Sequence, residues 1–176
     1  MSLREDEYRA LRDTIRERGT ARVWVVIAGV FAWAALTAAT AALSSTPLGT
    51  LLPLLMLATA FEIVYALHVG VERIGRYLQV FHESATDSPG WEHIAMAFGR
   101  PAGAASVDPL FAALFALAAL VNLMPALVLQ PIRAELIFVG GAHALFALRV
   151  IVARQTAAKQ RAIDLERFQQ LRRESA

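Results

Sequence analysis

The sequence alternates between long stretches without a charged residue and shorter stretches that are dense in charge. No Asp, Glu, Lys or Arg occurs in the 39 residues from Val23 to Phe61. Two further uncharged runs cover 109–132 and 136–148. A helix needs about 20 apolar residues to cross a bilayer, so this pattern predicts membrane-spanning helices.

The first uncharged run is long enough for two spans, at about 23–43 and 51–70. The turn-forming residues Ser44–Gly49 separate them and predict a tight hairpin. Pro53 then falls in the first turn of the second span, where its missing N–H removes no helical hydrogen bond.

The third span is predicted at about 109–129, where Asp108 and Pro109 form a typical helix start and Pro125 is expected to bend the outer end. The fourth, at about 134–153, contains Arg149. That side chain has to extend toward the membrane surface if this helix crosses the bilayer. The predicted fold is an all-α integral membrane protein, a four-transmembrane-helix bundle.

The basic residues fix the predicted orientation. Of the 17 Lys and Arg residues, only Arg133 lies in a turn on the opposite side from the two ends of the chain. Basic residues concentrate on the cytoplasmic side of membrane proteins. We therefore expect both termini in the cytoplasm (N-in/C-in), in what is predicted to be a bacterial cytoplasmic membrane, and the first span as a retained anchor.

Three stretches outside the spans have helical patterns and predict long cytoplasmic helical extensions. Residues 1–20 read as a cytoplasmic amphipathic helix, and 155–176 as a helical tail. Between them, 21–154 form the four-span membrane domain, which includes the cytoplasmic segment 71–108. The second span continues into this segment to about Glu83, and a short interfacial helix is expected from Asp87 onward.

Composition agrees with a membrane protein and removes several classes of function. The chain is 57% hydrophobic and 18% charged, which is too apolar for an ordinary soluble domain of 176 residues. It contains no cysteine, so disulfide and thiolate chemistry are excluded. No motif typical of catalysis or phosphate binding is present. We accordingly name no catalytic, cofactor-binding or metal-binding residue, and expect no nucleic-acid partner.

Four polar residues are predicted to lie deep in the bilayer, one on each span. Glu62 falls about 16 Å from the outer end of its span, Asn122 and His143 about 12–14 Å, and Thr37 about 10 Å. These depths allow a single intramembrane polar layer. It either fastens the bundle through interhelical hydrogen bonds or handles protons, ions or a ligand. An enclosed Glu62 would be protonation-switchable.

A second polar stripe follows one helix face where the second span leaves the membrane: Tyr65, His68, Glu72 and Arg76. Ion pairing explains the stripe. His68 and Glu72 alone provide too few ligands for a transition metal, and His68 and His143 differ too much in depth to share a haem.

Two functions remain from the sequence. The first is a non-catalytic integral membrane subunit or scaffold that acts through bundle and cytoplasmic-helix contacts. The second is a small oligomeric channel or proton-coupled transporter that uses the midplane carboxylate of Glu62. In either case the expected partners are the lipid bilayer and either further copies of the chain or the other subunits of a heteromeric complex.

Overall fold

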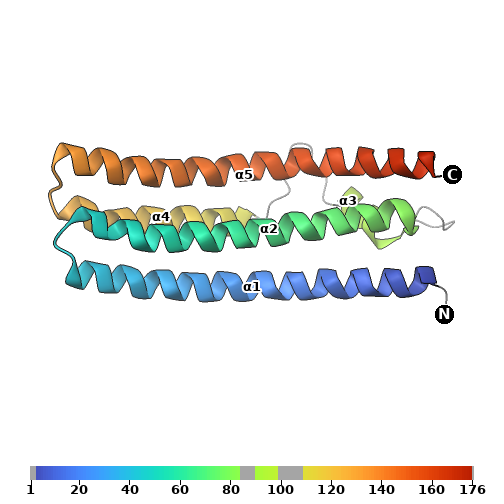
Figure 1. Ribbon diagram of the computed structural model, residues 1–176, viewed down its shortest axis with the longest axis horizontal. Coiled ribbons are helices and arrows are strands. Elements are labelled where there is room, and N and C mark those ends of the chain that lie inside the picture. Colours follow the sequence, from blue (N-terminus) through green and yellow to red (C-terminus); the bar gives the residue numbers. More distant parts are fainter. Residues whose placement is uncertain (1–2, 84–89, 99–108, 176) are drawn as a thin grey trace. The chain divides into compact units, whose positions relative to one another are not determined.

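The computed structural model describes residues 3–83, 90–98 and 109–175. Their elements are α1 (Leu3–Leu43), η1 (Pro47–Thr50), α2 (Leu51–Phe81), α3 (Trp91–Phe98), α4 (Pro109–Val128) and α5 (Arg133–Glu174) (Figure 1). No strand occurs within these ranges, and four helices are long and apolar enough to cross a membrane. The prediction of an all-α chain with four membrane-length helices is confirmed.

Three of the helices are much longer than a membrane span. α1 contains 41 residues, so the amphipathic segment and the first predicted span form one helix rather than two elements. α2 has 31 residues and ends at Phe81, two residues before the predicted end, and α5 has 42. The predicted helix start at 87–89 and the cap at Asp108 lie outside the described residues.

The chain divides into two compact units. The apolar unit comprises Val23–Tyr65 and Val107–Ala153, and the polar unit comprises Met1–Arg22, Ala66–Ser106 and Arg154–Ala176. α1, α2 and α5 each contribute to both units, whereas α3 belongs to the polar unit and α4 to the apolar unit.

The core of the apolar unit forms around aromatic side chains. Phe61 packs edge-on against Phe115 of α4 and Phe146 of α5, with ring centroids 5.4 Å and 5.9 Å away. Leu57 and Phe115 are almost completely buried. Edge-to-face contacts add to the van der Waals packing that holds helices together where lipid replaces water.

Helices α1 and α2 approach each other closely at Gly29. A Cβ atom built onto Gly29 would lie 2.6 Å from the Cβ of Ala60, closer than two carbon atoms can pack. Gly29 and Ala60 are both buried. The absence of a side chain on Gly29 permits this close approach.

In the polar unit, two arginines from different helices bind the free carbonyl groups at the end of α2. Arg4 of α1 donates to the carbonyl of Phe81, and Arg172 of α5 donates to that of Val80 at 2.7 Å. The last carbonyls of a helix have no partner within the helix and carry its partial negative charge. The two guanidiniums therefore join α1 and α5 to this end of α2.

Replacing Gly29 by alanine should separate α1 from α2. We expect Gly29→Ala to lower the free energy of unfolding in detergent by about 1–3 kcal/mol, because the added methyl group has no space. Gly19→Ala on the same helix is the matched control. A Cβ there meets nothing within 4 Å, so this variant should gain up to about 1 kcal/mol from helix propensity. Equal effects of the two variants would contradict the close contact.

Candidate functional site

Asn122 is the centre of a hydrogen-bond network inside the apolar unit. Its side chain is fully buried. The amide nitrogen donates to the carbonyl of Thr50 at 2.8 Å and lies 3.0 Å from Nε2 of His143. The amide oxygen accepts bonds from Nε1 of Trp33 and Oγ1 of Thr37, both at 3.3 Å. Both donors and both acceptors of the carboxamide are thus used.

The surroundings of His143 fix where its ring proton lies. Nδ1 is 2.8 Å from the carbonyl of Val139, one turn earlier in α5, and a carbonyl can only accept. Nδ1 therefore carries the hydrogen, and Nε2 is left as the acceptor for Asn122. His143 is 6% exposed. The ring has no unused nitrogen for a ligand.

Asn122 thereby joins four elements: α1, η1, α4 and α5. Three of the four residues expected in one polar layer, Thr37, Asn122 and His143, are in this network. Trp33 and Thr50 also belong to it and were not predicted. Trp33 lies one helical turn before Thr37, and that spacing is the signal that could have identified it.

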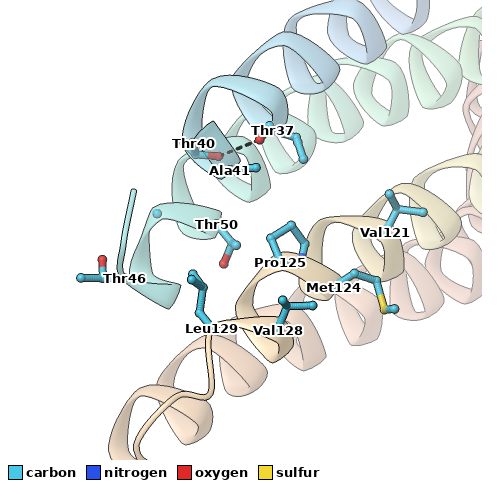
Figure 2. A pocket seen from close by; sticks show the side chains of 11 residues that line it. Thr37, Thr40, Ala41, Thr46, Thr50, Val121, Met124, Pro125, Val128 and Leu129 are labelled. Atoms are coloured by element: carbon cyan, nitrogen blue, oxygen red, sulfur yellow. Dashed lines mark hydrogen bonds between the residues drawn. The ribbon is translucent and has the colours of Figure 1, made fainter. Parts of the chain in front are cut away.

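A groove of about 490 Å³ lies beside this network. Figure 2 shows Thr37, Thr40 and Ala41 of α1 near one side and Val121, Met124, Pro125 and Val128 of α4 near the other. No charged residue lines it.

Three of the four threonine hydroxyls that line the groove already donate to the protein itself. Thr37 donates to Asn122, Thr40 to the carbonyl of Leu36, and Thr50 to that of Pro47. An anion that lost its water in this groove would find neither a positive charge nor an unused hydroxyl donor among these three residues. The groove is therefore a poor anion site.

Glu62 lies apart from the Asn122 network. Its carboxylate forms two bonds of 2.8 Å with the guanidinium of Arg149, one from Nε and one from Nη2. The guanidinium also covers the rings of Tyr65 and Phe61, at 5.0 Å and 5.9 Å from their centres. The side chains of Glu62 and Arg149 are 48% and 39% exposed. Glu62 is thus on the surface of the apolar unit rather than enclosed.

The predicted stripe on α2 divides among several partners. Tyr65 belongs to the Arg149 cluster of the apolar unit. In the polar unit, Nδ1 of His68 lies 3.1 Å from Arg22. Glu72 pairs with Arg76 of its own helix at 3.4 Å and with Arg161 of α5 at 2.7 Å. His68 therefore connects α2 to α1, and Glu72 connects α2 to α5.

Arg76 is the most buried cation of the stripe, at 5% exposure. Burial lowers its pKa below the ordinary value, and the carboxylate of Glu72 opposes that effect. Arginine nevertheless stays charged at neutral pH. A buried charge of this kind needs its partners, so the Glu72 contact contributes to the order of the polar unit.

A third polar cluster surrounds Glu83, which follows the end of α2. Its carboxylate accepts the backbone N–H groups of Glu92 and His93 at 2.8 Å and 3.1 Å, in the first turn of α3. Arg12 of α1 lies 3.8 Å from Glu83 and donates to Glu92 at 2.8 Å. Burial by itself raises the pKa of Glu83, but the hydrogen bonds from Glu92 and His93 outweigh it, so the pKa is lowered.

No protein-family model, curated protein or solved structure matches this chain. The function therefore has to be argued from its own side chains. The Asn122 network uses every hydrogen-bonding position of the carboxamide, which suits a structural connection between helices. The Glu62–Arg149 pair is a charged feature on the exposed surface of the apolar unit.

Replacing Asn122 should loosen the apolar unit. We expect Asn122→Leu to lower the free energy of unfolding in detergent by roughly 2 kcal/mol, since four hydrogen bonds between helices are lost. Met124→Leu, at an exposed position on the same helix, is the control and should change the stability little. An Asn122→Leu variant as stable as the original protein would show that the network does not stabilise the apolar unit.

Acid should detach α3 in the polar unit. The folded-state pKa of Glu83 lies below its unfolded value of about 4.3, so this stabilisation is complete at neutral pH and disappears as the pH falls through the folded pKa. Hydrogen exchange of residues 91–98, corrected for the chemical rate, should accelerate there. Glu83→Gln should exchange fast already at pH 7, whereas Glu166→Gln, at an exposed position, should behave like the original protein.

Proposed function

We propose that this protein is a non-catalytic integral membrane subunit that assembles with a second copy of itself through one side of its spans. The observation that supports this most is the Glu62–Arg149 ion pair on the exposed surface of the apolar unit. We name this side the Glu62 flank and define it by Thr59 and Glu62 of α2 and by Leu145, Arg149 and Val152 of α5, which are exposed or partly exposed.

The depth of Glu62 gives the Glu62–Arg149 ion pair a high free-energy cost in contact with lipid. Glu62 lies eleven residues after Leu51, the first residue of α2, which corresponds to about 16 Å of helix in a hydrocarbon layer about 30 Å thick. A charged side chain in the middle of a bilayer costs several kcal/mol unless protein or water covers it. A protein surface against the flank would remove the ion pair from hydrocarbon.

The charges of the flank favour a second copy as that surface. In a twofold-symmetric dimer the same patch is used by both subunits. Glu62 of one subunit can then approach Arg149 of the other, so that each charge gains a second opposite partner. The small Thr59 next to this pair allows close approach, as is typical of helix contacts in membranes.

The polar unit supports a structural role in its own way. Its helices α1, α2 and α5 are joined by pairs such as Arg73–Asp164, at 3.2 Å, and Tyr77–Glu7, at 2.7 Å. These contacts use up charges that would otherwise be available for a partner. We therefore propose that assembly occurs through the spans rather than through this unit.

A proton-coupled transporter is the weaker proposal. Among the described residues, Glu62 bonds to Arg149 and is not a partner of Asn122 in the buried network. The acceptor nitrogen of His143 is also occupied. Proton uptake by liposomes that contain the protein, together with its loss in Glu62→Gln, would support the transporter proposal.

Disulfide cross-linking tests the dimer directly, because the chain has no cysteine of its own. In native membranes, oxidised Thr59→Cys should form a dimer of twice the monomer mass, because two copies of the flank face each other. Leu120→Cys, at an exposed position of α4, is the control and should stay monomeric. Adding Arg149→Leu to Thr59→Cys should reduce the cross-linked fraction.

Two outcomes would refute the proposal. A Thr59→Cys protein that stays monomeric, or cross-links no faster than Leu120→Cys, would show that the flank faces lipid. A cross-linked product of some other mass would mean that a different membrane protein covers the flank and that the contact is heteromeric.

A further inference from the structure

A cleft of about 320 Å³ lies within the polar unit, where α2, α3 and α5 meet. Its wall consists of Gln79, Val80, His93, Leu165, Gln169, Arg172 and Arg173. Five of these seven side chains carry N–H groups: two guanidiniums, two carboxamides and one imidazole. None of the seven carries a carboxylate. Such a lining has many hydrogen-bond donors and a positive charge.

The structure holds Arg172 in place and leaves most of its donors available. Arg172 uses one bond, at 2.7 Å, to the carbonyl of Val80, while a guanidinium has five N–H donors. Gln79 is 9% exposed and accepts a bond from Arg76 on its amide oxygen. This bond comes from a residue of the same helix and orients the amide group of Gln79.

A hydrogen bond to Glu83 orients the ring of His93. Nδ1 lies 3.1 Å from a carboxylate oxygen of Glu83. A carboxylate accepts only, so Nδ1 holds the hydrogen and the ring is oriented by this bond. The Glu83 side chain itself is 6% exposed and is bonded to backbone N–H groups.

We propose that this cleft binds a small phosphate-bearing anion. Guanidinium groups match the oxygens of phosphate in pairs, and the carboxamide N–H group of Gln169 can bind a remaining oxygen. The volume is at the lower end for ligand sites and suits a phosphate or diphosphate group rather than a large cofactor.

The anion can be free in solution or be part of a lipid headgroup, since both present the same oxygens. Gln79 and Val80 lie nine and ten residues after Gly70, where the sequence predicts that the second span ends. At 1.5 Å per residue, this is about 14 Å of helix beyond the span. That distance favours a soluble anion over a headgroup in the bilayer surface.

Calorimetric titration of the full-length protein in an uncharged detergent, with inorganic pyrophosphate as the probe, tests this site. The original protein should bind pyrophosphate in a one-to-one ratio. Arg173→Gln should weaken binding at least tenfold through the loss of a charged donor, and Gln169→Glu should weaken it further by placing a carboxylate in the cleft. Both residues are exposed, so these variants should fold.

The matched control is Arg167→Gln, which removes the same charge from an exposed position of α5 outside the cleft lining. It should bind pyrophosphate like the original protein. Absence of pyrophosphate binding overturns the proposal. So does an equal loss in Arg167→Gln and Arg173→Gln, because attraction to net charge would then explain the binding. Circular dichroism of each variant checks that its helices are intact.

Nanodiscs distinguish the two sources of phosphate. The protein is placed in discs of phosphatidylcholine alone or with added phosphatidic acid, and titrated again with pyrophosphate. Unchanged affinity assigns the cleft to a soluble anion. An affinity that falls with phosphatidic acid in the original protein, but not in Gln169→Glu, assigns it to a lipid headgroup. Both results support a phosphate site.

Discussion

A carboxamide buried among apolar helices is stable only when both of its donors and both of its acceptors are used. Asn122 meets this condition with partners on α1, η1 and α5. A slip of any of these elements along its neighbours would leave a polar group unpaired where no water can replace the partner. The network therefore sets the register of the apolar unit, and the packing around Phe61 operates within that register.

The polar unit obtains its order by different means. Salt bridges, carbonyl groups bound by arginine and an aromatic group around Tyr77 hold its helices. Individual surface ion pairs contribute little, but those near Arg76 and Glu83 are largely shielded from solvent. The apolar unit thus depends on complete hydrogen bonding, and the polar unit depends on charge pairing. This difference follows the uncharged and charged stretches of the sequence.

Charge-free runs predict the number of membrane-length helices, because span length follows from bilayer thickness. They do not predict the full extent of α1, α2 and α5, because these helices continue through the charged stretches. Helix rise also predicts depth, which is why Thr37, Asn122 and His143 were expected at one level. Rise does not predict rotation about the helix axis, so Glu62 was assigned to the same layer although it lies on the surface. Contacts such as Arg12–Glu92 were not foreseen because 32 charged residues allow many pairings.

The hydrogen bonds around Asn122 all run in one direction. Hydrogens pass from Trp33 and Thr37 to the amide oxygen, from the amide nitrogen to His143, and from that ring to the carbonyl of Val139. A proton added to Nε2 of His143 would face the amide hydrogens of Asn122. The carboxamide would then have to turn over and present its nitrogen to Trp33 and Thr37. The indole N–H of Trp33 would then face another donor, whereas the hydroxyl of Thr37 can turn and accept, so protonation on α5 would break the link to α1 through Trp33 and keep the one through Thr37.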